Sequence, residues 1–152
     1  MWVDQRGSEI LTRGECLRLL ARGSRESPVG RIGVQGRDAP IVLPVTFAFV
    51  EDGIVASIGP GRLSELAPGS LVAFEVDHVD RDAHEAWDVL VRGLATELTA
   101  EERARLGERV PRPVIHVPGD RVLRIRPDVV TGRRFSLDTS RGEDGPPDPS
   151  PA

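Results

Sequence analysis

The chain has 152 residues, of which 39% are hydrophobic and 29% charged, and its 24 acidic residues outnumber its 20 basic ones. This length suits one domain and is short for two. The formal net charge of -4 excludes the broad basic face that binding to a nucleic-acid backbone requires. No apolar run approaches the length of a membrane span, and the single cysteine, Cys16, excludes an internal disulfide. Composition therefore predicts a soluble cytoplasmic protein without nucleic-acid or membrane partners.

The first half of the chain changes from helical to strand patterning near Pro28. Residues 1–10 are expected to form a flexible lead-in. Thr12 and Glu15 have the spacing of a capping box ahead of a leucine-rich run, which predicts a helix over about 12–22. Short runs rich in Val and Ile then predict strands at 29–34, 41–50 and 54–58. The last two strands are separated by Asp52-Gly53, a typical hairpin turn, and are therefore expected to pair antiparallel.

The second half of the chain alternates short strands with turn signals. The sequence GPGR at 59–62 ends a strand, and RLSEL at 62–66 predicts one or two helical turns. Alternating apolar residues predict strands at 71–79 and around Trp87, and Thr99 with Glu102 repeats the capping box for a helix over about 100–107. A loop follows at 108–120, and the last strands are expected at 121–127 and 129–135. The Pro-rich tail, 136–152, has one leucine as its only large apolar residue and is expected to be disordered.

Six or seven short strands with few helices favour a mainly β fold. The expected domain is a small antiparallel barrel with short helices over 11–135. The hairpin and the lack of strand–helix alternation exclude a doubly wound parallel sheet. The chain has no P-loop, G-x-G-x-x-G or G-x-S-x-G pattern, which removes the common nucleotidase, Rossmann and hydrolase interpretations. The acidic run at 77–85 lacks calcium-loop and zinc-helix spacing, so we expect a solvated connection and no metal site.

Five segments, in order, resemble one known family. They are LTRGECLRLLA, VGRIGV, LPVTFAFVEDGIVASIGPGRL, WDVLVRGLATEL and RIRPDVVTGRRF. Together they look like the pyridoxamine 5'-phosphate oxidase-like flavoproteins, in particular their small actinobacterial-type members, over about 11–135. The resemblance implies a six- to seven-stranded split β-barrel of the FMN-binding type. It also implies a homodimer that holds flavin mononucleotide (FMN), or a deazaflavin or FAD in some branches, in clefts between the two barrels.

The central segment PVTF at 44–47 is where the resemblance places the flavin ring. It implies that Val45, Thr46 and Phe47 border the ring. A flavin needs a flat apolar wall, and these residues supply one together with a hydroxyl. The residues alone equally allow Val45 and Phe47 to form one inward face of a strand. Pro44 lacks an N–H donor and therefore fits an edge or bulged position.

The GPGR sequence is the candidate site for the cofactor phosphate. The chain contains no lysine, so an anion site must use arginine, backbone amides or hydroxyls. Glycine lets the backbone approach an anion, and Arg62 adds a fork of donors. By resemblance, Gly61, Arg62 and Leu63 bind the cofactor, and Ser57 stands where relatives often carry arginine. The same sequence is also what a tight strand-to-helix turn looks like.

Trp87 and three arginines each have two interpretations. By resemblance, Trp87 opens the strand that reaches the partner subunit and its flavin, although a tryptophan at a strand start is also typical of a core. Arg92 either serves the flavin or pairs with a carboxylate. Arg133 and Arg134 match basic residues near the family's cleft, and they equally suit a solvated edge strand.

The resemblance implies a flavin-dependent oxidoreductase that transfers hydride between a reductant and a small organic substrate. In such proteins the cofactor carries the reaction, and the chain needs no catalytic acid or base. We accordingly predict no catalytic residue. Oxidation of pyridoxamine phosphate itself is not expected, because the chain lacks a second cluster of cations for the substrate phosphate. The alternative is a non-enzymatic dimer that binds or sequesters flavin, haem or another ligand.

Overall fold

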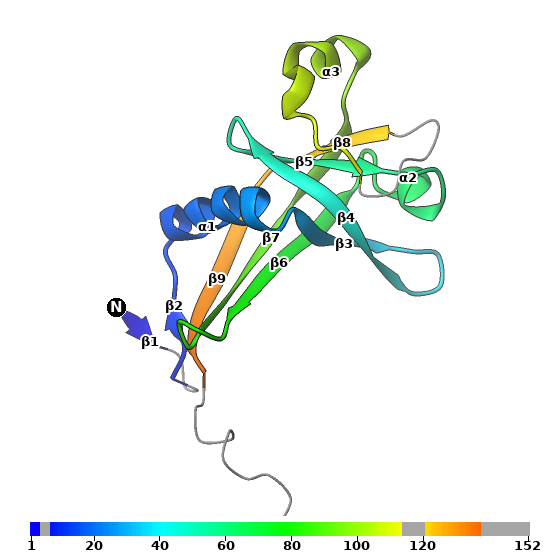
Figure 1. Cartoon of the computed structure of the whole chain (residues 1–152). Coiled ribbons are helices and arrows are strands. Elements are labelled where there is room, and N and C mark those ends of the chain that lie inside the picture. Colours follow the sequence, from blue (N-terminus) through cyan, green and yellow to red (C-terminus); the bar gives the residue numbers. More distant parts are fainter. Residues whose placement is uncertain (4–6, 114–120, 138–152) are drawn as a thin grey trace, which may run out of the picture.

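The computed structural model describes residues 1–3, 7–113 and 121–137, and it shows an antiparallel sheet curled into a barrel (Figure 1). The strands are β1 (Trp2–Val3), β2 (Glu9–Ile10), β3 (Val29–Gln35), β4 (Pro40–Val50), β5 (Gly53–Ile58), β6 (Leu71–Asp80), β7 (Glu85–Glu97), β8 (Arg121–Ile125) and β9 (Val129–Ser136). The helices are α1 (Arg13–Glu26), α2 (Arg62–Leu66), α3 (Ala100–Leu106) and the 3-10 turn η1 (Gly107–Arg109). In the described part of the chain, no helix is both long and apolar enough to cross a membrane.

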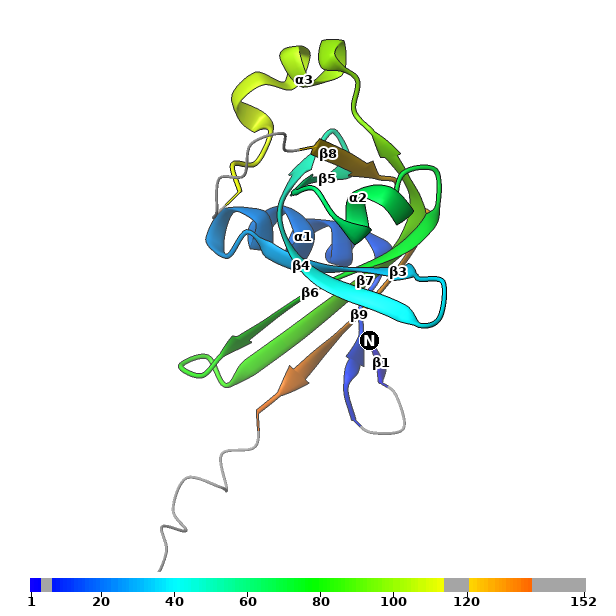
Figure 2. The same cartoon turned by 90° about the vertical axis from the view of Figure 1, so that its right-hand side faces the viewer.

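Six strands close the barrel in the order β7-β6-β3-β4-β5-β8, because β8 pairs with both β5 and β7. Strand β7 changes partner along its length. Its first part pairs with β9 and its last three residues pair with β8. The β6–β7 hairpin and β9 therefore extend beyond the closed barrel, toward the lower part of Figure 2. This arrangement is a split β-barrel and confirms the predicted fold class.

Gly93 allows the change of partner in β7. A Cβ atom at Gly93 would lie 1.6 Å from the carbonyl oxygen of Arg126. The Arg126 N–H donates a hydrogen bond to the Leu94 carbonyl at 3.1 Å, so the chain between β8 and β9 crosses β7 at this point. Only glycine permits so close an approach of two backbones.

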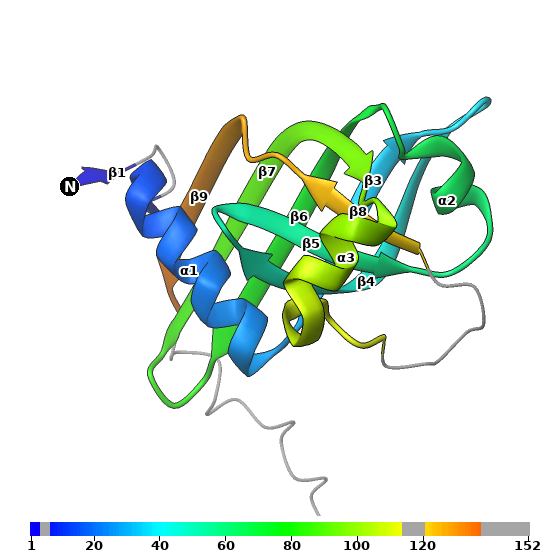
Figure 3. The same ribbon diagram turned by 90° about the horizontal axis from the view of Figure 1, so that it is seen from above.

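The core fills the barrel and continues beneath α1. Phe47 and Phe74 are fully buried and meet edge to face, with ring centroids 4.9 Å apart. Helix α1 packs against β4, β6, β7 and β9 (Figure 3). Full burial of a large apolar side chain contributes about 1.5–3 kcal/mol. A second, smaller apolar cluster joins α3 to the barrel and consists of Val50, Val55, Leu98, Leu106 and Val122.

Both predicted capping boxes are present. The Thr12 hydroxyl accepts a hydrogen bond from the Glu15 N–H, and the Glu15 carboxylate accepts one from the Thr12 N–H. Thr99 and Glu102 repeat this exchange at α3. Helix α1 continues to Glu26, beyond its predicted end at 22, because nothing in the sequence before Pro28 stops it.

The hairpin between β4 and β5 is confirmed, but its turn lies one residue earlier than predicted. Glu51 and Asp52 are the central residues, with φ of 51° and 57°, and Gly53 already pairs with Val50. Two left-handed central residues make a type I′ turn, whose twist suits antiparallel strands. Asp52-Gly53 therefore marks the end of the turn rather than its centre.

Pro44 occupies an open edge of β4, as its missing N–H required. The Phe47 N–H donates to the Pro28 carbonyl on the β3 side. Because neighbouring residues of a strand point their polar groups to opposite sides, those of Pro44 point away from β3. Strand β5 begins to pair with β4 only at Thr46, so Pro44 faces no strand there.

The structure describes most of the expected lead-in at the N-terminus but little of the expected tail at the C-terminus. Within the expected lead-in, Ile10 pairs with Arg133 of β9, and Glu9 pairs with Arg134. The two-residue strand β2 therefore pairs with a partner more than a hundred residues away in the sequence. Strand β9 ends at Ser136, and the predicted disordered tail lies outside the described residues from 138 onward.

Candidate functional site

Strands β3, β4 and β5 and the chain after η1 meet at an open pocket of about 350 Å³. It is lined by Val29, Pro44, Val45, Thr46, Ser57, Gly59 and Pro113. Three of the predicted cofactor-binding residues, Val45, Thr46 and Ser57, therefore share one pocket. None of the described residues that line it is charged, so these residues give the pocket apolar walls and two hydroxyls.

The pairing of β4 with β5 fixes the two hydroxyl-bearing residues. Thr46 lies directly opposite Ser57 in the antiparallel register. The Val45 side chain is 6% exposed and packs in the main core at the base of the pocket. The Ser57 hydroxyl donates a hydrogen bond to the Pro111 carbonyl at 2.5 Å. This bond ties the end of β5 to the segment that carries Pro113.

The GPGR turn begins at the pocket and leads away from it. Gly59 lines the pocket, whereas Gly61, Arg62 and Leu63 do not. Leu63 is 5% exposed and belongs to the main core. The Gly61 N–H donates to the Ser64 hydroxyl, which donates back to the Gly61 carbonyl. One backbone amide expected at the phosphate is thus already engaged within the turn.

Arg62 is exposed beside this turn. Within the described part of the chain, its guanidinium has no ion pair or hydrogen bond. Its five donors therefore face solvent three residues from the pocket-lining Gly59, and they can reach an anion without breaking a contact.

Phe47 and Trp87 lie in the core rather than in the pocket wall. Phe47 faces the barrel interior against Phe74. Trp87 is 3% exposed and packs beneath α1, where its ring would be 3.2 Å from a Cβ at Gly23. The Arg22 guanidinium lies 5.7 Å from its ring centroid. The indole N–H is buried and has no partner among the described residues.

The pocket also contains residues that the sequence did not reveal. Val29 begins β3 opposite Thr46, and the strand pattern could have placed it there. Pro113 reaches the pocket only through the path of the chain after η1, for which no local signal exists. Both enlarge the apolar wall.

The outer face of β4, β6, β7 and β9 combines apolar and charged side chains. Val42, Leu71, Leu90 and Val129 are 65%, 76%, 38% and 45% exposed. A cavity of about 460 Å³ on this face is lined by Ile10, Glu75, Asp88, Leu90, Thr131, Gly132 and Arg133. Burial raises the pKa of Glu75, and the neighbouring Asp77 adds to the effect. An unpartnered face of this kind is typical of an interaction surface.

The arginines singled out in the sequence behave differently from one another. Arg133 pairs with Asp88 at 3.1 Å, and Arg134 pairs with Glu9 at 3.1 Å. These contacts fit the interpretation of a charged strand. Arg92 is exposed and has no ion pair within the described ranges, so it remains available to a ligand or a second molecule.

The described residues contain no group of three or more His, Cys, Asp or Glu side chains that could hold a metal ion. In the acidic run, Asp77 pairs with Arg31, and the Asp80 carboxylate accepts a hydrogen bond from the Ala83 N–H in the β6–β7 turn. These contacts account for part of the run as hairpin structure.

Comparison with known proteins agrees with this architecture. The family model for pyridoxamine 5'-phosphate oxidase matches residues 12–134. The chain belongs to this family. An uncharacterized protein of Mycobacterium tuberculosis is 30% identical over 135 residues, which cover 85% of this chain and 86% of that protein.

Two solved structures of family members are similar in both sequence and fold. A protein from Corynebacterium glutamicum, named as a candidate pyridoxamine 5'-phosphate oxidase, has 28% identity and a TM-score of 0.73, with 86% of this chain and 99% of that chain covered. An FAD-binding protein from Mycobacterium smegmatis has 26% identity and a TM-score of 0.68, with 84% and 98% covered. The family likeness therefore extends over the whole barrel.

Proposed function

We propose that the chain is a flavin-dependent oxidoreductase that binds FMN and acts on a small organic substrate. The observation that carries the proposal is the pocket that joins Val45, Thr46 and Ser57 beside the GPGR turn. The relative from Mycobacterium smegmatis binds FAD, which supports a flavin and leaves FAD and a deazaflavin as alternatives to FMN.

The pocket offers each part of a flavin a suitable environment. Val45 and Pro44 supply apolar surface for the ring, and the Thr46 hydroxyl can hydrogen-bond its polar edge. The exposed guanidinium of Arg62, three residues after the pocket-lining Gly59, is the proposed charged donor for the phosphate. When bound, the flavin supplies the hydride chemistry, while the chain orients it and excludes water from one side.

The exposed outer face supports a homodimer as the working state. Apolar side chains from β4, β6, β7 and β9 share that face with the exposed Arg92. A second copy of the chain would cover this apolar surface through a self-complementary contact. Light scattering at micromolar concentration is expected to give a dimer, and a 16.5 kDa species would contradict this state.

Titration with FMN and riboflavin tests the flavin site. A charge-assisted hydrogen bond contributes about 1.5–3 kcal/mol, so Arg62→Ala should weaken FMN binding by roughly tenfold to more than a hundredfold. Riboflavin lacks the phosphate, and its affinity should remain unchanged. Arg37→Ala, which removes an exposed arginine from the β3–β4 turn, is the matched control. Equal losses for both ligands, or no loss for FMN, would remove Arg62 from the phosphate site.

A non-enzymatic ligand-binding dimer is the second candidate. Two observations favour it. The pocket-lining residues that the structure describes are all uncharged, and both the Ser57 hydroxyl and the Gly61 amide are engaged within the protein. The two candidates differ in redox turnover. A bound flavin that is reduced by a nicotinamide donor and reoxidised by an acceptor, over repeated cycles, supports the enzyme, and a flavin that stays oxidised supports the binding protein.

A further inference from the structure

Glu51 occupies an unusual backbone position in the turn between β4 and β5. Its φ is 51°, a left-handed conformation that asparagine, aspartate and glycine adopt more easily than glutamate. Non-glycine residues in this region tend to persist where the surrounding structure holds them in place. The contacts of the Glu51 side chain hold this residue in place.

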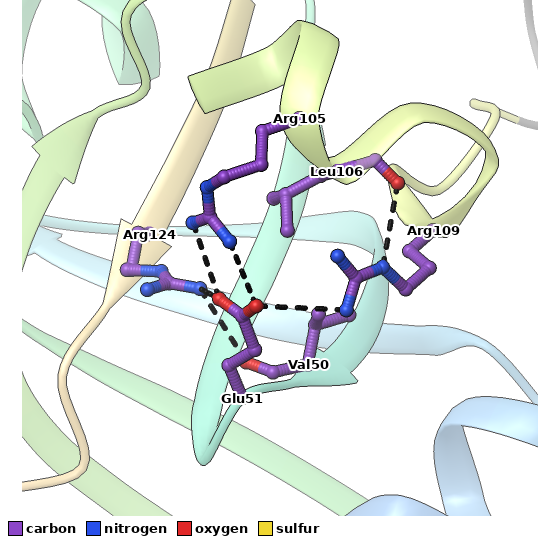
Figure 4. Close-up of polar contacts among 6 residues, drawn as sticks. All are labelled: Val50, Glu51, Arg105, Leu106, Arg109 and Arg124. Atoms are coloured by element: carbon purple, nitrogen blue, oxygen red, sulfur yellow. Dashed lines mark hydrogen bonds and ion pairs between the residues drawn. The ribbon is translucent and has the colours of Figure 1, made fainter. Parts of the chain in front are cut away.

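The Glu51 carboxylate is the centre of a cluster of three arginines (Figure 4). Arg105 of α3 donates to both carboxylate oxygens, at 2.8 and 3.2 Å. Arg109 of η1 and Arg124 of β8 approach it at 3.6 and 3.5 Å. The hydrogen bond from Arg105 is the main reason that the pKa of Glu51 is lowered. The β4–β5 turn is thus joined to α3 and η1 by ion pairs of Glu51.

Among the described residues, few apolar contacts join the barrel to the segment 98–113, which contains α3 and η1. They are made in the small cluster in which Leu98 and Leu106 meet Val50, Val55 and Val122, with Val110 at the margin. Segments with few buried apolar contacts open at lower free energy than the rest of a domain. The Glu51 cluster adds ionic contacts that join this segment to the barrel.

The far end of the same segment forms a wall of the candidate cofactor pocket. The Pro111 carbonyl accepts the hydrogen bond from Ser57, and Pro113 lines the pocket opposite β4. Only Val110 separates Pro111 from η1. A displacement of η1 therefore moves the wall, although Glu51 itself does not line the pocket.

We propose that Glu51 is a positioning residue for this pocket: through Arg105 and Arg109 it holds the segment 98–113 closed, and Pro113 thereby completes the wall. The identity of the ligand rests on the proposed flavin function, whereas the closure of the segment does not. Because the two are coupled, a ligand that contacts the wall must also lower the equilibrium constant for opening of the segment, by the same factor by which opening weakens its binding.

Limited chymotrypsin digestion measures the closure directly. Leu106 is 3% exposed, so cleavage after it requires the segment to leave the barrel. The test variant is Glu51→Asn, which removes the carboxylate and gives the left-handed position a residue that prefers it. The control is Glu9→Gln, which also removes a carboxylate paired with an arginine but lies on β2, away from α3.

Glu51→Asn should accelerate cleavage after Leu106 by about fivefold or more, since the coupling between sites in a protein is typically of this size. Its global unfolding midpoint, followed by tryptophan fluorescence, should stay near that of the wild type. Arg109→Gln should act in the same direction from the other side of the cluster, and Glu51→Asp should restore slow cleavage. Unchanged cleavage in both Glu51→Asn and Arg109→Gln would overturn the proposal.

Riboflavin binding distinguishes the role of Glu51 at the pocket wall from its role in holding the segment 98–113 closed. It should slow cleavage after Leu106 in the wild type and bind more weakly to Glu51→Asn, while Glu9→Gln behaves as the wild type. Faster cleavage without any change in riboflavin affinity would overturn the role of Glu51 at the pocket. If the wild type binds neither riboflavin nor FMN, the proposed flavin function fails, and the cleavage rates alone then decide whether Glu51 holds the segment.

Discussion

Replacement of Gly93 by alanine should be among the most damaging small changes in this barrel. The new Cβ would lie 1.6 Å from the Arg126 carbonyl oxygen, where no side chain can yield because the obstacle is backbone. Overpacking of this kind costs about 1–3 kcal/mol, and loss of the Arg126–Leu94 hydrogen bond adds about 0.5–1.5 kcal/mol. The free energy of unfolding should therefore fall by roughly 1.5–4.5 kcal/mol.

Gly33→Ala is the matched control, since a Cβ at Gly33 meets its nearest atom, the Cβ of Ala73, at 3.7 Å. Alanine is favoured over glycine in a strand interior by about 0.5–1 kcal/mol, so this variant should be neutral or slightly stabilised. Urea unfolding at one fixed protein concentration, analysed by linear extrapolation, gives both values. The outcome against this reasoning is a loss of less than about 1 kcal/mol in Gly93→Ala, or equal losses in the two variants. Either result would mean that the close approach of the β8–β9 connection to β7 does not require glycine at position 93.

Two further predictions concern the core and the charged surface. Phe47→Ala should lower the free energy of unfolding by about 3–5 kcal/mol, because the ring is fully buried against Phe74; a cost near that of a surface substitution would place Phe47 outside the core. Acid should lower the thermal midpoint. The pKa values of Glu51, Glu97 and Glu102 are lowered in the folded chain, mainly by hydrogen bonds from Arg105, Arg121 and the Thr99 backbone. These carboxylates therefore stabilise the folded chain above the unfolded pKa of about 4.3. The stabilisation is lost as the pH falls from there through the lowered pKa values of the folded chain. A midpoint that rises on acidification would contradict these pairs.

Local signals in the sequence predicted the elements well, and contacts between distant segments were harder to foresee. Thr12 and Thr99 marked both helix starts, because a capping box is complete within four residues. The Asp52-Gly53 signal found the hairpin and missed its central residues by one position. The pairing of β2 with β9 has no local signal in the sequence, because the two-residue strand β2 is stabilised by a partner more than a hundred residues away.

The candidate site shows the same division. Val45, Thr46 and Ser57 meet because the β4–β5 hairpin sets their register, and a hairpin can be read from the sequence. Pro113 joins them through the closure of the segment 98–113, which depends on tertiary contacts alone. Trp87 fitted a core and a cofactor contact equally well in the sequence, and the packing of α1 places it in the core.

The most direct test of the proposed flavin site is an equilibrium titration of the wild type and of Thr46→Phe with FMN, followed by flavin fluorescence. Thr46 is half-buried on the pocket wall, so phenylalanine there fills the pocket while the strand keeps its pairing. We expect saturable binding of one FMN per chain by the wild type and loss of binding in the variant. Equal binding by both proteins would place the flavin elsewhere, and no binding by the wild type would contradict the proposed flavin site itself.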